Sequence, residues 1–578
     1  MKRIIIYFIS VIAVLAFTNC EDFLDTKSYS EKDLTNFPEN VDDANQMLTG
    51  IYASMNVDIL SGFYIGELAS DERFGGGSDT DKFMHAIDRL MNSGANMCAG
   101  LWWARYRGIQ RANLLFENID RVTGWRNDEQ KNQIIGEAFF LRALFYFELM
   151  QVYGEVPLML TTESLNLPKS SAEVVYARIA SDLKEAIKLI EAAEYNPEQA
   201  GHASRWSAQA LMARVFLFYT GYYKKDALPL ADGGSVAKAE VVAWLEDCID
   251  NSGHELIIDS ENPGNGFYNL WPYSNEYTAV DYQWAKDNKV KWVGDGNHET
   301  VFAIKHNNFG SWGDWSGYTN MHATHFGIRS PNGSKSTFPF GEGYGAGPVN
   351  PQLINDWKSS EPGDIRLWGS VIDVENDLPE FQWGGDLQME ETGYFQKKYL
   401  TITAYDHVKL SDDGSPRLLT SYSHLMYKTP EAPMQLASTQ DLVLIRFADV
   451  LLMHSELTQT AQGINKVRTR AGLSEIGGYT LEALKKERRF ELAFEGVRWY
   501  DLMRWGDAPA ALEKQGDVMV RNMGGELVQM ASYGGGWAAR YAETGGFWPI
   551  PERQISLSAG VLEQNKGWGT LESEYFGW

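Results

Sequence analysis

The chain has 578 residues, of which 44% are hydrophobic and 13% aromatic, so it can bury a large core and is neither a disordered nor a fibrous protein. Its 77 Asp and Glu residues outnumber its 51 Lys and Arg residues, which gives a formal net charge of −26 at pH 7. A charge of this size disfavours nucleic acids, anionic lipids and polyanionic ligands, and leaves neutral ligands open.

The first segment is an export signal in which MKR is followed by an apolar run over residues 4–17 and then by Cys20. The run is shorter than the roughly 20 apolar residues of a membrane-spanning helix. It resembles a bacterial lipoprotein signal, which implies that residues 1–19 are removed and that Cys20 is acylated on sulfur and nitrogen. FTN before Cys20 departs from the usual pattern, but Bacteroidetes-type lipoproteins are looser there, and Glu21 and Asp22 resemble a surface-export signal. An ordinary secretory signal that happens to end at a Cys is the alternative.

A helical pattern continues through most of residues 41–223. Its clearest segment, residues 134–149, has apolar residues at a spacing of 3.6 residues on one face and aromatic residues on a second face. A helix with two apolar faces must lie between others. The pairs Phe145/Phe147 and Phe216/Phe218 recur about two tetratricopeptide periods apart. The pattern favours stacked helix pairs.

Residues 224–439 have a different composition, which is rich in Gly, Pro, Asn, Asp and Trp. A short strand is expected at 300–305, but no long periodic helix. A loop-rich stretch of this length is usually where function is carried. Helices are expected again within 442–459 and 481–505, and residues 508–578 are expected to be irregular.

The sequence therefore predicts a mostly α fold, a tetratricopeptide-type helical scaffold that carries a long irregular lobe with short strands. The expected parts are the scaffold at 20–223, the ligand-binding lobe at 224–439 and the C-terminal helices at 440–578. We expect 20–578 to form one compact unit.

Catalytic signatures such as HExxH, GxSxG, a P-loop or GxGxxG are absent from the sequence. Two thiols far apart, Cys98 and Cys248, form no disulfide framework and are expected to be buried. His322 and His325 lack a clear third ligand for zinc. The sequence predicts no enzyme, no cofactor and no metal site.

Three glutamates spaced by four residues, Glu487, Glu491 and Glu495, could pose as an acid/base pair, but neighbouring arginines make ion pairing the plainer interpretation. Arg142, among aromatics, is expected to be a buried fork that bonds backbone or carboxylate groups.

Several motifs, in this order, resemble the SusD/RagB family of surface lipoproteins: FLD at 23–25, GEAFFLRALFYF at 136–147, YGEVPL at 153–158, RFADVLLM at 446–453, NKVRTRAG at 465–472, ERRFELAFEGVRWYDL at 487–502, PIP at 549–551 and QN at 564–565. The resemblance implies a tetratricopeptide-containing lipoprotein, anchored by its lipid to the outer membrane and exposed at the cell surface. It implies a SusC-like TonB-dependent outer-membrane barrel as partner, and glycan or oligosaccharide capture for import.

Aromatic residues in the irregular lobe are the main candidate ligand contacts, because a sugar ring buries its C–H face on an indole or phenol while its hydroxyls stay at the rim. The candidates are Trp312, Trp315, Tyr318, Trp271 and Tyr273. The alternative for each of them is packing inside the scaffold.

A second candidate is the polar loop at 70–78, where the resemblance implies ligand contacts from Asp71, Arg73 and Phe74, together with Asn96 further on. Trp102, Trp103 and Tyr106 match a family helix pattern and are expected to pack. Two other functions remain open. The chain could be a peptide-binding importer of the same fold, or a surface glycoside hydrolase.

Overall fold

The computed structural model describes residues 37–56, 61–94, 96–307, 319–330, 333–530 and 535–578. Cys20 and the candidates Trp312, Trp315 and Tyr318 lie outside these residues.

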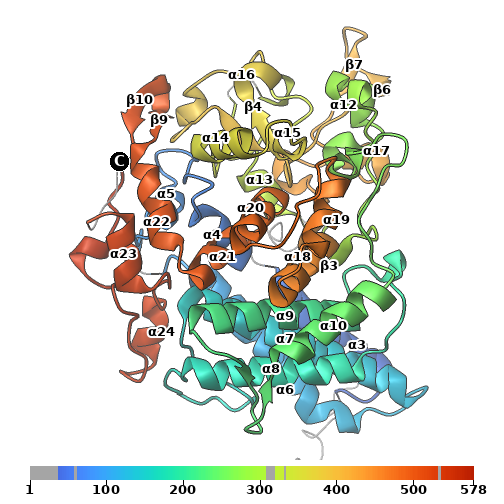
Figure 1. The fold of residues 1–578 in the computed structure, drawn as a ribbon, viewed down its shortest axis with the longest axis vertical. Coiled ribbons are helices and arrows are strands. Elements are labelled where there is room, and N and C mark those ends of the chain that lie inside the picture. The colour runs from blue at the N-terminus through green and yellow to red at the C-terminus, as the bar shows by residue number, and fades with distance from the viewer. Residues whose placement is uncertain (1–36, 57–60, 95, 308–318, 331–332, 531–534) are drawn as a thin grey trace, which may run out of the picture.

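Long antiparallel helices form the scaffold, in the lower half of Figure 1. Consecutive helices of this scaffold pack on one another, and α3 lies against α6 and α7. The helices are α3 Val41–Tyr52, α6 Ala99–Asn118, α7 Asp128–Tyr153, α8 Ala172–Leu189, α9 Arg205–Tyr222 and α10 Lys238–Asn251. This arrangement confirms the predicted mostly α fold, and it is consistent with a tetratricopeptide-type scaffold.

The helix α7 shows why a segment with two apolar faces must be sandwiched. It begins after Asn127, whose side chain accepts a hydrogen bond from the Gln130 amide, and ends at Gly154, where φ is 70°. Phe147 on one face lies edge-on to Phe218 of α9, with ring centroids 6.0 Å apart. The phenylalanines that recur in the sequence therefore join two helices of the scaffold.

A two-stranded antiparallel pair joins the lobe to the C-terminal part, formed by β3 Thr300–Ile304 and β8 Leu442–Arg446. The predicted strand at 300–305 is confirmed. The expectation of a helix from residue 442 is wrong for its first residues, because 442–446 pair with β3 and α18 begins only at Phe447 (Phe447–Thr458). A short apolar run does not distinguish a strand from a buried helix by periodicity alone.

The C-terminal helices pack between the scaffold and the lobe: α19 Gln462–Arg470, α20 Leu481–Glu491 and α21 Arg498–Trp505. The segment 481–505 is broken by a turn in which Phe494 and Gly496 have φ values of 66° and 74°. A Cβ at Gly496 would meet the Phe63 ring at 2.6 Å, so this position requires glycine both for its backbone angle and for space.

The lobe contains mostly short elements, as its composition predicts. The exception is α10, a helix of 14 residues where none was expected. The others are β1 Leu228–Pro229, β2 Ser235–Val236, α11 Asn265–Tyr268, α12 Gln283–Asn288, α13 Met321–His325, α14 Pro351–Ser360, α15 Arg366–Ser370, β4 Val371–Asp373, α16 Val374–Asp377, β5 Tyr394–Gln396, β6 Tyr405–Leu410, β7 Pro416–Leu418 and α17 Ser423–Met426.

Short elements complete the two ends of the described chain: α4 Gly62–Leu68, α5 Lys82–Asp88, α22 Ala508–Glu513, β9 Met519–Asn522, β10 Glu526–Gln529, α23 Trp537–Thr544 and α24 Glu552–Leu557. The last part of the chain is thus less irregular than predicted. Within the described residues, no helix combines the length and the apolar character that crossing a bilayer requires.

Candidate ligand-binding site

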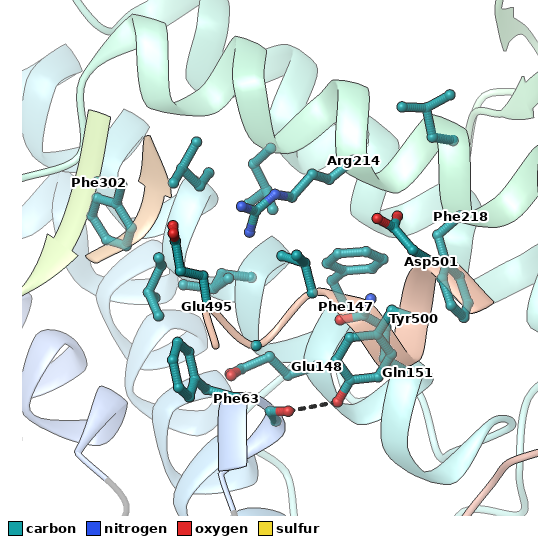
Figure 2. Close-up of a pocket in the computed structure, with 18 of the residues that line it drawn as sticks. Phe63, Phe147, Glu148, Gln151, Arg214, Phe218, Phe302, Glu495, Tyr500 and Asp501 are labelled. Carbon is teal, nitrogen blue, oxygen red and sulfur yellow. Dashed lines mark hydrogen bonds between the residues drawn. The ribbon is translucent and has the colours of Figure 1, made fainter. Parts of the chain in front are cut away.

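A cavity of about 90 Å³ lies where α7 and α9 meet β3, β8 and the C-terminal helices (Figure 2). Its walls are largely aromatic and aliphatic, with a few charged side chains, among them Phe63, Phe147, Glu148, Arg214, Phe218, Phe302, Glu495 and Asp501. Ligand pockets usually measure roughly 300–1,000 Å³. The cavity is therefore too small for a sugar ring.

The charged groups around this cavity are paired with one another. Arg214 donates from Nε to Asp449 at 2.8 Å, and Arg488 bonds both Asp449 at 2.6 Å and Asp501 at 2.8 Å. Burial alone would raise the pKa of Asp449, but the two guanidinium charges outweigh it and lower that pKa to about 2. The cavity thus marks a structural junction between scaffold and C-terminal helices.

The glutamates at 487, 491 and 495 are buried and ion-paired, as predicted. Arg446 bonds Glu495 at 2.6 and 2.8 Å and Glu491 at 2.9 Å, and Arg366 bonds Glu487 at 2.6 Å. The partners come from distant segments and not from the adjacent arginines. Burial opposes ionisation of Glu491, yet the surrounding cations hold its pKa below the usual range. A carboxylate held in this way is a poor general acid.

Arg142 confirms its predicted role as a buried fork. Its Nε and Nη2 donate to the two carboxylate oxygens of Asp182 at 2.7 and 2.8 Å, and its Nη1 donates to Asn113 at 2.8 Å. Cys98 and Cys248 are free and buried, also as predicted. Among the residues that the structure describes, no group of three or more His, Cys, Asp or Glu side chains could hold a metal ion.

Two of the candidate aromatics lie inside the protein. Trp271 is only 3% exposed and lies against Lys398, whose Nζ is 4.8 Å from the ring centroid. Tyr273 is fully buried and donates from its hydroxyl to the Gly369 carbonyl at 3.0 Å. The packing alternative is favoured for both, since neither ring has a free face for a ligand.

The loop at 70–78 is equally enclosed. Asp71 accepts from Arg498 at 2.8 and 2.9 Å, and its pKa lies below the usual range because Arg498 and Arg489 outweigh the effect of burial. Arg73 is completely buried, with its guanidinium between the rings of Phe326 and Phe494 and a hydrogen bond to the Gly347 carbonyl at 3.0 Å.

Phe74 is buried too, whereas Asn96 is exposed at the surface, where its side-chain oxygen accepts from the Arg553 amide at 3.2 Å. The structure thus places the 70–78 candidates in the interior and Asn96 elsewhere, next to α24.

Trp103 is the aromatic residue that sequence reasoning missed. Trp102 and Tyr106 pack inward as expected, but Trp103 is 43% exposed, so the packing prediction is wrong for this residue. Trp103 lies on a different face of α6 from Trp102 and Tyr106, a face that it shares with the exposed Arg107. The signal was available, because the charged Arg107 follows Trp103 at the four-residue spacing that places both on one face.

An open groove of about 480 Å³ lies beside Trp103, which we call the Trp103 groove. It is formed by α6, the segment that follows α7, and α24, and is lined by Trp102, Trp103, Tyr106, Pro157, Met159, Ser164, Leu165, Asn166, Leu167, Gln554, Leu557, Ser558 and Leu562. Two further grooves, of about 560 and 540 Å³, contain many charged side chains, including Glu137 and Glu194 in the first and Arg489 and Asp507 in the second.

Two family models match the chain. One, described as starch-binding associating with outer membrane, matches residues 22–217, and the other, the SusD family, matches 341–568. The chain belongs to the SusD family. SusD-like protein P38 of Formosa agariphila is 22% identical over 88% of this chain and 92% of its own.

Solved SusD-like structures share the fold. Surface glycan-binding protein A from Bacteroides fluxus is similar with a TM-score of 0.68 and 22% identity, covering 92% of this chain and all of its own. A laminarin-binding SusD-like protein is similar with a TM-score of 0.65 and 23% identity, and with the same coverage. A third similar structure is surface glycan-binding protein A from Bacteroides thetaiotaomicron in complex with laminarihexaose. Its TM-score is 0.65 and its identity 18%, over 91% of this chain and 99% of its own.

Proposed function

We propose that this chain is a lipid-anchored protein of the outer-membrane surface that binds neutral glycans and passes them to a SusC-like TonB-dependent barrel without breaking a bond. The observation that carries the proposal is family membership over both ends of the chain, including a model described as starch-binding associating with outer membrane. Relatives that match over nearly their whole length bear names of glycan-binding proteins.

The physical properties of the chain support this function. A net charge of −26 disfavours polyanions and leaves neutral sugars as ligands. Trp312, Trp315 and Tyr318 stay the proposed aromatic platform, because they follow β3 in a Gly- and Ser-rich segment. Stacking on such rings gives weak binding to short ligands. A lipid on Cys20 would compensate by holding the protein at high effective concentration above its barrel.

A binding screen tests the proposal. The soluble chain that starts after Cys20 is run on affinity gels that contain laminarin, starch, xylan or mannan, and is titrated with peptides in parallel. We expect retention by at least one neutral polysaccharide, and at least about tenfold weaker binding in Trp312→Ala or Trp315→Ala, which is a loss of roughly 1.4 kcal/mol. Trp578→Ala, at an exposed tryptophan of the C-terminus, is the matched control.

Binding of peptides without any glycan would overturn the proposal in favour of a peptide importer. Release of reducing ends from a polysaccharide would contradict the non-enzymatic part. Loss of membrane association in Cys20→Ala, and co-purification of the wild-type protein with a large outer-membrane barrel, test the anchor and the partner separately.

A further inference from the structure

The Trp103 groove differs from the two charged grooves in its chemistry. None of the described residues that line it is charged, although acidic residues are abundant in the chain. Its volume of about 480 Å³ lies within the usual range for a small-ligand site. The groove therefore suits a neutral ligand.

An exposed indole forms one wall. Among the described tryptophans only Trp103 and Trp578 have large exposed fractions, 43% and 42%. Trp578 is held by its Nε1 donating to Glu390 at 3.1 Å and by the Arg89 guanidinium over its ring. Trp103 has no hydrogen bond within the described part of the chain, and its only ring contact there is the exposed Arg553, 5.7 Å from the centroid.

The floor of the groove is held in place by hydrogen bonds and a ring contact. Tyr106 donates from its hydroxyl to the Pro157 carbonyl at 2.8 Å, and its ring lies 4.8 Å from that of Trp102. Asn166 donates to the Ser558 carbonyl at 2.9 Å, which ties the segment after α7 to the end of α24. A preformed floor reduces the entropy that binding costs.

Polar groups without intramolecular partners lie around this floor. Within the described residues the side-chain amide of Gln554 and the hydroxyl of Ser164 form no hydrogen bond. Amides and hydroxyls both donate and accept, as sugar hydroxyls do. The apolar side chains of Leu165 and Leu557, which are largely exposed, add surface for the C–H face of a ring.

We propose that the Trp103 groove is an accessory glycan-binding site that takes a neutral hexose segment of the same polysaccharide. This inference rests on the proposed function and adds to it a second point of contact on the scaffold. A glycan is favoured over a protein partner because the groove combines an aromatic face with amide and hydroxyl groups that form no hydrogen bond among the described residues. The residues that line it are uncharged, and the nearest charge is the exposed Arg553 beside the Trp103 ring. Two weak sites on one chain increase the apparent affinity for long polymers more than for short ones.

The test compares long and short ligands. Isothermal titration with the polysaccharide retained in the screen, and with its hexasaccharide, is carried out on the wild type and on Trp103→Ala, Trp103→Phe and Gln554→Ala. We expect Trp103→Ala to bind the polysaccharide about 5- to 20-fold more weakly, with one hexasaccharide site instead of two, and Trp103→Phe to recover most of the loss.

Arg107→Ala, one turn further on the outer face of α6, is the matched control and should bind as the wild type does. If the wild type binds glycan and Trp103→Ala binds it equally, the accessory site is wrong while the proposed function stands. If no glycan binds to the wild type, both are wrong. If Trp103→Ala instead loses a co-purifying barrel and keeps full glycan binding, the groove docks a protein and the inference is overturned.

Discussion

Trp271 and Trp103 lie in different kinds of structure, and the exposure of each is the opposite of what its surroundings predict. Trp271 belongs to a loop-rich stretch, where an aromatic residue is expected to face a ligand, yet it is 3% exposed. Trp103 belongs to a regular helix, where it is expected to pack, yet it is 43% exposed. Irregular chain therefore does not imply an exposed side chain, and helical chain does not imply a buried one.

The reason is the way in which each region builds its core. Apart from α10, the described part of the lobe has short helices and two-stranded sheets, which offer no broad apolar faces. It fills its interior with large rings such as Trp271, which lies edge-on to Tyr399 with ring centroids 5.4 Å apart. A helix such as α6 keeps an outward face, on which an apolar side chain stays in water and gains little from folding. Packing does not explain an aromatic residue on that face, so its presence needs another explanation, such as a ligand contact.

The largest effect is expected at Trp271. Trp271→Ala should lower the free energy of unfolding by about 3–5 kcal/mol, because it removes a buried indole and leaves a cavity beside Lys398 and Arg446. The measurement is urea unfolding followed by circular dichroism. Trp271→Phe, which keeps an aromatic ring, should lower the free energy of unfolding clearly less than Trp271→Ala does. A stable Trp271→Ala protein with weakened glycan binding would show that this ring faces a ligand after all.

An intermediate effect is expected in the 70–78 loop, where polarity suggests a ligand contact and the structure shows ion pairs. Asp71→Asn should cost roughly 1.5–3 kcal/mol of stability, because it leaves Arg498 without its bidentate partner. Glycan affinity of the folded fraction should be unchanged. Asp79→Asn, at an exposed position nearby, is the control for the loss of one negative charge. Weaker glycan binding at full stability would contradict the structural role.

The fold was predictable where local pattern decides it. The scaffold helices have long 3.6-residue periods, and Arg142 among aromatics was expected to bond backbone or carboxylate groups, of which Asp182 is one. The strand β8 was not predictable, because its partner β3 lies far away along the chain. The same limit applies to the site, since the burial of Arg73 depends on Phe326 and Phe494, contacts that no local pattern encodes.

The candidates Trp312, Trp315 and Tyr318 and the division of the chain at 223 and 439 stay predictions. Sequence could nevertheless have identified Trp103. The buried face of α6 carries Trp102, Tyr106 and Asn113, whereas Trp103 shares another face with the charged Arg107 four residues further on.

The smallest effect on stability is expected at Trp103 itself. Trp103→Ala should change the free energy of unfolding by less than about 0.5 kcal/mol, because the side chain is 43% exposed and its one ring contact among the described residues is with the exposed Arg553. The measurement is the same urea unfolding as for Trp271→Ala, so the two tryptophans are compared on one scale. A loss of 2 kcal/mol or more, which is the order expected for a buried aromatic, would mean that Trp103 packs against the groove as part of the core. Its exposed face would then no longer be evidence for a ligand, and the contrast between the two regions would vanish.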